Sequence, residues 1–144
     1  MAELFETYRG TVQTWHCDHM GHMNVMWYVG KFDEATWNLF AAFGVTAGFM
    51  RAQRRGMAAV QQNITYRREL HVGETVLVRS VLLELRDKVA KFVHEMRNAE
   101  TGEIAAVCVL TGVHIDAETR KSCPFPAEIL ERGRKLVGAY DLPS

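Results

Sequence analysis

The longest periodic run of hydrophobic positions predicts an amphipathic helix from Val25 to about Phe43. Its apolar residues recur at steps of three and four, which is the period of an α-helix. Asn24 precedes the run and suits the N-cap, where its side chain accepts from a free backbone N–H, and Gly44 suits the other end. The predicted buried face holds Val25, Val29, Phe32, Ala35 or Thr36, Leu39, Phe40 and Phe43, whereas Lys31, Glu34 and Asn38 lie away from it.

Period-two and continuous apolar runs elsewhere in the chain predict strands. Residues 57–70 alternate between apolar and polar positions, whereas 75–86 and 104–115 are apolar on both faces, as central strands are. Pro126 favours the start of a final helix. The predicted strands are 4–14, 57–70, 75–86, 89–98 and 104–115, the last helix is 127–138, and 45–56 shows no period that assigns an element.

This order of elements predicts an α+β fold in one domain, residues 1–144. The last four strands are joined by short connections, which favour antiparallel pairing. The long helix then has to be covered by one face of a five-stranded antiparallel sheet. Because two strands are apolar on both faces, we expect another copy of the chain to bury part of the sheet.

Composition excludes several classes of protein. Lys and Arg total 17 and Asp and Glu total 17, so no basic excess indicates a nucleic-acid partner. No apolar run reaches the roughly 18 residues of a membrane-spanning helix, and the first residues do not resemble a secretory signal. Three cysteines at unrelated spacings fit a reducing compartment, so we expect a cytoplasmic protein.

The polar segment 13–24, directly before the long helix, holds the densest candidate chemistry. His16, His19 and His22 beside Cys17 raise the possibility of a metal site, but their spacing matches no familiar zinc signature, and we expect no metal. Cys17 next to His16 raises the possibility of a thiolate nucleophile, although neighbours in sequence point in different directions. Cys108 and Cys123 are most simply structural.

A third interpretation makes Asp18 a carboxylate that works at a helix N-terminus. Asp18 lies six residues before Asn24, close enough for the loop to fold it back toward the first free N–H groups of the helix. Those groups carry partial positive charge and can hold a developing oxyanion. Attack on a carbonyl, with Asp18 as general base or nucleophile, would fit this arrangement.

The segment from Asp18 to Tyr28 resembles the Asp-x-x-Gly-His-x-Asn-x-x-x-Tyr signature of acyl-CoA thioesterases related to 4-hydroxybenzoyl-CoA thioesterase, which have the hot-dog fold. The resemblance covers roughly residues 5–116. It implies that Asp18 is the catalytic carboxylate, that the N–H near Val25 polarises the thioester carbonyl, and that His22 and Asn24 are orienting groups. Tyr28 matches the aromatic position of the signature.

The resemblance also implies the partners. The substrate is an acyl-CoA, coenzyme A is part of that substrate, and no separate cofactor is needed. The chain is expected to assemble as a dimer or tetramer, with the active site at a subunit interface. Two rival functions remain open, namely a hydratase or dehydratase on the same fold, and a non-catalytic module that binds acyl thioesters.

Substrate contacts are less constrained by the sequence. Relatives place phosphate-binding residues where this chain has Arg86-Asp87-Lys88, and we include Arg86 and Lys88 as candidates although Asp87 opposes them. Arg54, Arg55, Arg67 and Arg68 are further candidates. An acyl pocket that accepts an aromatic or cationic group by cation–π contact is predicted from the following aromatic residues: Trp15, Trp27, Tyr28, Trp37 and Tyr66.

Overall fold

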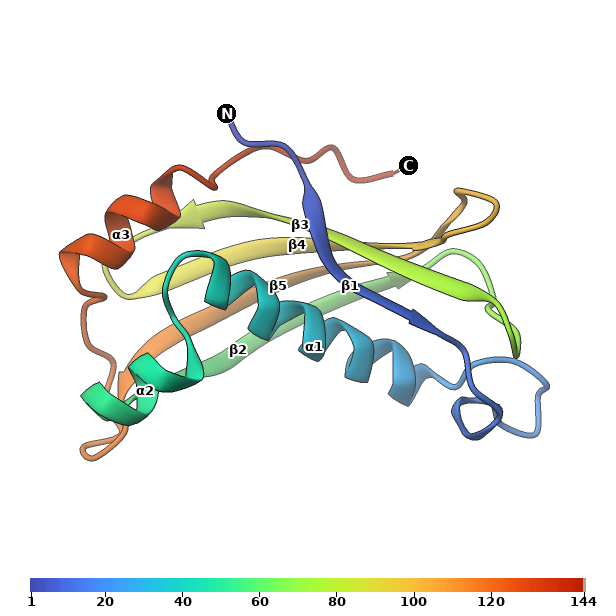
Figure 1. The fold of residues 1–144 in the computed structure, drawn as a ribbon, viewed down its shortest axis with the longest axis horizontal. Helices are drawn as coiled ribbons and strands as arrows, with labels where there is room; N and C mark the ends of the chain where they lie inside the picture. The colour runs from blue at the N-terminus through green and yellow to red at the C-terminus, as the bar shows by residue number, and fades with distance from the viewer. Residues whose placement is uncertain (144) are drawn as a thin grey trace.

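A computed structural model describes residues 1–143 as five antiparallel strands and three α-helices, with one short 3₁₀ turn (Figure 1). The strands are β1 (Phe5–Thr11), β2 (Arg55–Tyr66), β3 (Thr75–Leu85), β4 (Val89–Asn98) and β5 (Ile104–Asp116). The helices are α1 (Val25–Ala42), α2 (Ala47–Gln53) and α3 (Ala127–Arg134), and the 3₁₀ turn is Thr14–His16.

The strands form one sheet in the order β1-β3-β4-β5-β2, and every pairing in it is antiparallel. The sheet curves around α1, which runs along its inner face (Figure 1). The predicted α+β class, with a long helix wrapped by a five-stranded antiparallel sheet, is therefore confirmed. β1 and β2 are the two edges.

The main core lies between α1 and the inner face of the sheet. Phe32, Ala35 and Leu39 of α1 are fully buried there against residues such as Phe92 and Leu82. At the far end of α1, α3 packs on the sheet through Gly133, where any side chain would overlap Leu85. Glycine suits this position, because a larger residue would have to displace the Leu85 side chain.

The buried face of α1 matches the predicted one from Phe32 to Phe43, but it differs from the prediction in the first half of the helix. Lys31 is only 3% exposed, although the pattern put it on the polar side, whereas Val25 and Val29 are 56% and 37% exposed. β1 supplies a polar partner for the buried Lys31, because Lys31 Nζ donates a hydrogen bond to the Tyr8 hydroxyl at 2.9 Å. The aliphatic stem of Lys31 is buried while its charged end finds a polar partner.

The outer face of the sheet is partly covered by the chain itself. Val81, Val93 and Val107 form a second buried cluster there, packed against Ala2, Leu4 and Tyr140 of the terminal segments. Gly138 and Ala2 pair as a short parallel bridge on the same side. Some of the apolar surface that we expected another copy to bury is therefore covered by the chain's own ends.

Candidate active site

The loop before α1 is held on both sides by backbone hydrogen bonds. The N–H of Asn24 donates to His16 O, and the N–H of Met23 donates to Leu70 O in the loop before β3. Within the loop, the Gly21 N–H donates to Asp18 O, and Gly21 has a φ of +86°, which glycine adopts readily. The segment Asp18–Asn24 therefore has a defined shape at the helix start.

Asn24 joins the carboxylate of Asp18 to the start of α1. Its side-chain Nδ2 donates to Asp18 Oδ2 at 2.7 Å, and its Oδ1 accepts from the N–H of Met26 at 2.9 Å. The second oxygen of Asp18 accepts from the N–H of Met20 at 2.8 Å. These two hydrogen bonds, the one from Asn24 above all, lower the pKa of Asp18, so the carboxylate is ionised at neutral pH.

The N–H of Val25 is the free donor at this helix start. Met26 N–H is taken by the Asn24 side chain, and Trp27 N–H bonds to Asn24 O, whereas Val25 N–H finds no acceptor in residues 1–143. Val25 is also exposed. A donor at the positive end of a helix and an ionised carboxylate are the two groups needed for attack on a carbonyl.

A small cavity of about 250 Å³ lies beside the same helix start. It is lined by several predicted site residues, which come from the loop, from α1 and from the end of β2. Tyr28 spans its base, because its hydroxyl donates to Arg68 O at 3.0 Å and its ring meets Tyr66 edge-on at 5.1 Å. The structure thus brings together His22, Val25, Tyr28, Tyr66 and Arg67.

Three other candidates lie elsewhere. The Trp27 ring packs on His16, with ring centroids 4.6 Å apart, so it faces neither cavity described here. Arg86 and Lys88 lie in the β3–β4 turn, next to α3 and at the opposite end of α1 from the loop (Figure 1). Within one chain they are separated from Asp18 by the length of the helix.

The metal and thiolate alternatives find no matching geometry. His16 Nδ1 accepts from the Gln13 N–H, His22 Nε2 lies 3.4 Å from a Glu69 oxygen, and His19 is exposed, so the three imidazoles have separate surroundings. In residues 1–143 no group of three potential ligands is placed to hold a metal ion. The Cys17 thiol contacts the Gln13 carbonyl rather than a histidine nitrogen.

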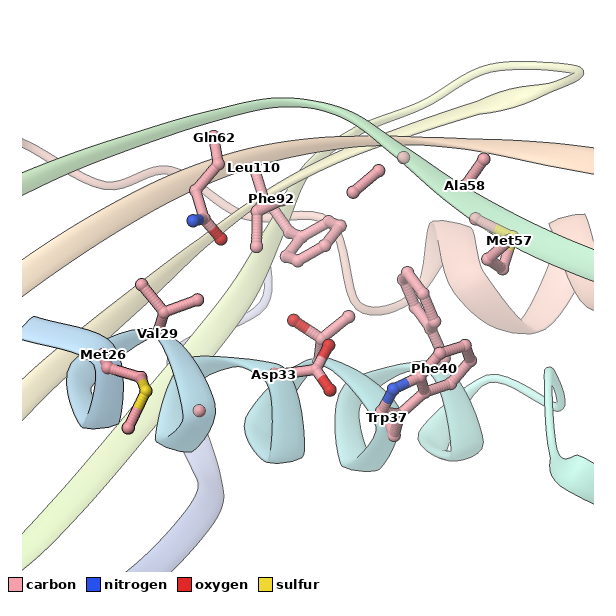
Figure 2. A pocket seen from close by; sticks show the side chains of 14 residues that line it. Met26, Val29, Asp33, Trp37, Phe40, Met57, Ala58, Gln62, Phe92 and Leu110 are labelled. Carbon is pink, nitrogen blue, oxygen red and sulfur yellow. The ribbon is translucent and has the colours of Figure 1, made fainter. Parts of the chain in front are cut away.

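A larger cavity of about 440 Å³ opens between α1 and strands β2 and β5 (Figure 2). The sequence pattern does not define this cavity, although Trp37 is among the aromatic residues predicted to line an acyl pocket. The pattern that marks it is a stripe along α1 at steps of three and four, on the side away from β1. The α1 residues that line it are Met26, Val29, Gly30, Asp33, Thr36, Trp37 and Phe40.

The opposite wall of this cavity is largely apolar. Met57, Ala58, Ala59 and Gln62 come from β2, Phe92 from β4, and Leu110 and Gly112 from β5. The cavity begins at Met26, one residue after the free Val25 N–H, and runs along the helix to Phe40. A chain-like group whose carbonyl lies at the helix start could therefore extend into it.

The fold and the site together define a hot-dog protein of the thioesterase kind, with a carboxylate at the start of the central helix. Over residues 12–133 the chain matches the Thioesterase-like superfamily, and it belongs to that family of thioester hydrolases. The structure places no helix among residues 1–143 that is long and apolar enough to cross a bilayer.

Named relatives are distant. The chain is 25% identical to a betainyl-CoA thioesterase of Pseudomonas aeruginosa, over 97% of the chain and 88% of the relative. It is 25% identical to the long-chain acyl-CoA thioesterase FadM of Escherichia coli, over 88% of the chain and 95% of that protein. It also matches an L-carnitine dehydrogenase/betainyl-CoA thioesterase of Rhizobium meliloti at 26% identity, over 85% of the chain but only 25% of the relative's length.

Solved structures support the fold. A hypothetical protein from Staphylococcus aureus, determined in complex with CoA, superposes with a TM-score of 0.89 and 19% identity, over 99% of this chain and 91% of that one. At this level of identity the similarity concerns the arrangement of the strands and helices.

Proposed function

We propose that this chain hydrolyses acyl-CoA thioesters at the start of α1. The observation that carries the proposal is the ionised Asp18, fixed by Asn24 at the same helix start as the unpaired N–H of Val25. The thioester carbonyl oxygen would accept from that N–H, and the positive end of the helix would stabilise the oxyanion. Family membership and the named relatives support this reaction class.

Two routes are compatible with the position of Asp18. As a general base, Asp18 takes a proton from a water molecule that attacks the carbonyl carbon, and the C–S bond then breaks to release the CoA thiolate. As a nucleophile, Asp18 attacks the carbonyl itself, releases the thiolate and forms a mixed anhydride, which water then hydrolyses. A single turnover in ¹⁸O-labelled water separates them, since only the nucleophilic route can place an unlabelled Asp18 oxygen in the product.

Coenzyme A would lie at the mouth of the smaller cavity. Arg67 and Arg68 are exposed at its rim; Arg67 donates to the Pro143 carbonyl, and Arg68 pairs with Glu103 at 3.0 Å. Guanidinium groups in these positions suit the phosphates of CoA. Arg86 and Lys88 would serve only if a second chain brings them to this mouth.

Self-association in the cytoplasm is part of the proposal. β2 is an edge strand of 12 residues, and most of it is exposed, including Val60 at 61%. A long edge strand presents a row of unpaired backbone N–H and C=O groups, and pairing with a second copy would satisfy them. A monomeric mass by light scattering at the assay concentration would contradict this part. The whole chain is proposed to act as one domain, residues 1–144.

The proposed catalytic role is tested by Asp18→Asn. The amide keeps the shape of the side chain but loses the charge, so thiol release from acyl-CoA should fall by about 10² to 10⁴-fold in kcat. Glu128→Gln is the matched control, because Glu128 is an exposed carboxylate on α3, at the opposite end of α1 from the loop (Figure 1). Wild-type rates in Asp18→Asn, across short, long, aromatic and cationic acyl-CoAs, would overturn the assignment.

A further inference from the structure

Asp33 is the single ionisable residue among those that line the larger cavity. Its carboxylate has no hydrogen-bond donor or ion-pair partner within residues 1–143. The other polar side chains of the lining are Thr36 and Gln62, and neither is charged. The cavity thus contains a negative charge that the chain itself leaves uncompensated.

Thr36 is not free to serve Asp33. Its hydroxyl donates to Phe32 O at 2.9 Å and lies 2.8 Å from His94 Nε2, so its hydrogen-bonding capacity is used inside the core. Burial lowers the pKa of His94 to about 3, so this histidine adds no positive charge behind the cavity wall. Asp33 is exposed, so water solvates its carboxylate in the free protein, and a positive charge that replaces this water would have to come with the ligand.

Asp33 lies beside an aromatic ring on the same helix face. Trp37 follows it by four residues, which places the two side chains one above the other on α1, and both border the cavity (Figure 2). Trp37 is 41% exposed, and its ring meets Phe40 edge-on at 5.6 Å. The face of an indole attracts cations, and a neighbouring carboxylate adds to that attraction.

We propose that Asp33 and Trp37 select acyl groups that carry a positive charge at the far end of the acyl chain. This inference rests on the proposed function, since it takes the thioester carbonyl to lie at Val25. A plain alkyl chain would instead cover an unpaired carboxylate with hydrocarbon, which costs free energy because the charge loses water without gaining a partner.

The distance along α1 sets the length of the acyl group. Asp33 follows Val25 by eight residues, which corresponds to about 12 Å along the helix axis. Met26, Val29 and Gly30 line the cavity between them. A Cβ on Gly30 would contact only Trp27, at 3.7 Å, so the space directly above Gly30 is open. We therefore expect the cation several bonds away from the carbonyl rather than next to it.

The decisive experiment compares two acyl-CoAs of the same shape and different charge. In 6-(trimethylammonio)hexanoyl-CoA the acyl chain ends in a quaternary ammonium, and 7,7-dimethyloctanoyl-CoA replaces it with a neutral tert-butyl group. We expect the wild-type kcat/KM for the cationic substrate to exceed that for the neutral one by about tenfold, the size of a partly exposed cation–π contact and ion pair together.

Substitutions in the cavity test which residues cause the preference for the cationic substrate. Asp33→Asn should abolish this preference, by lowering kcat/KM for the cationic substrate while kcat/KM for the neutral substrate stays unchanged or rises. Trp37→Leu should reduce the preference. Glu34→Gln is the matched control, because Glu34 is an exposed carboxylate one residue along α1 that does not line the cavity. A preference that is absent in the wild type, or that survives in Asp33→Asn, overturns the inference.

A binding measurement separates this inference from the proposed catalysis. The two substrates are replaced by non-hydrolysable thioether analogues, in which a CH₂ group takes the place of the thioester carbonyl. The affinities of the two analogues are measured by calorimetry for the wild type and for Asp33→Asn. If no acyl-CoA is hydrolysed, the proposed function fails, whereas tighter binding of the cationic thioether that depends on Asp33 still supports the subsite. Equal affinities for both thioethers refute the subsite even in an active enzyme.

Discussion

The Asn24 side chain makes two contacts at the candidate site, one through its oxygen and one through its nitrogen. The oxygen caps α1 by accepting from Met26 N–H, and the nitrogen donates to Asp18. Because one planar amide makes both contacts, the carboxylate is positioned relative to the same helix end that offers the free Val25 N–H. The amide also stabilises the ionised form of Asp18, which is the form that either hydrolytic route needs.

Asn24→Asp should therefore alter the pH dependence of activity more than it alters stability. Aspartate still caps the helix, so any loss of stability at neutral pH should come from the lost hydrogen bond to Asp18 and the new repulsion, and not from the cap. It cannot donate to Asp18 and adds a like charge, so the pKa of Asp18 should rise. The acid limb of the kcat/KM profile should then move to higher pH, measured by thiol release between pH 4 and pH 8.

Asn24→Ser provides the intermediate case. Serine keeps a good cap and removes the donor to Asp18 without adding a charge. The acid limb should lie highest in Asn24→Asp and lowest in the wild type, with Asn24→Ser between them. An acid limb at the same pH in all three proteins would mean that Asp18 does not act as the ionised group.

At the scale of elements, the sequence predicted the architecture because periodicity reports burial. The long helix and the five strands followed from apolar spacing, and short connections predicted the antiparallel pairing, whereas the order of the strands within the sheet was not predicted. The helix α2 was not predicted, since its seven residues are too few to show a period, even though Thr46 caps it. The strand predicted over 57–70 ends at Tyr66, and α3 ends at Arg134 rather than 138.

The residues of the candidate site were predicted where they belong to one local motif and were missed where they come from distant parts of the chain. The local motif predicted that His22, Asn24 and Val25 lie near Asp18. The structure joins Asp18 directly to Asn24, whereas His22 and Val25 line the small cavity, whose lining does not include Asp18. The cavity lined by Asp33 was missed, because it forms between α1 and strands far away in sequence. Lys31 was placed on the wrong face because a polarity pattern cannot anticipate the hydroxyl that Tyr8 supplies from β1.

The Lys31–Tyr8 contact joins α1 to the edge strand β1, and its contribution can be measured. Lys31 Nζ is 2.9 Å from the Tyr8 hydroxyl and 5.1 Å from the ring centroid. Tyr8→Phe leaves the buried ammonium without its hydrogen-bond acceptor, so it should lower the free energy of unfolding by about 1 to 3 kcal/mol in urea titrations. In a Lys31→Met background, Tyr8→Phe should lower the free energy of unfolding by less than about 0.5 kcal/mol, because no buried donor is left without an acceptor. Equal costs in both backgrounds would show that the contact is not what holds β1 on the helix.

At the scale of the whole molecule, a buried polar chain ties the helix to the centre of the sheet. Thr7 of β1 contacts Ser80 of β3 at 2.7 Å, Ser80 contacts His94 Nδ1 of β4, and His94 Nε2 contacts Thr36 of α1 at 2.8 Å. Thr36 uses its proton on Phe32 O, so it accepts from His94 Nε2–H, and Nδ1 accepts from Ser80. The network is complete only with a neutral imidazole.

This network predicts that the fold weakens in mild acid. Burial lowers the pKa of His94 from its ordinary value of 6.5 to about 3. Below pH 6.5 His94 is protonated in the unfolded chain but stays neutral in the folded chain. The free energy of unfolding present above pH 6.5 is therefore lost progressively toward pH 3, at up to about 1.4 kcal/mol per pH unit. The pKa values of His16 and His114 are also lowered, mainly by burial, and add in the same direction. In urea titrations from pH 7 to pH 4, His94→Gln should show a shallower decline than the wild type, whatever its stability at pH 7. Parallel declines in the two proteins would mean that His94 is not the group whose protonation the fold resists.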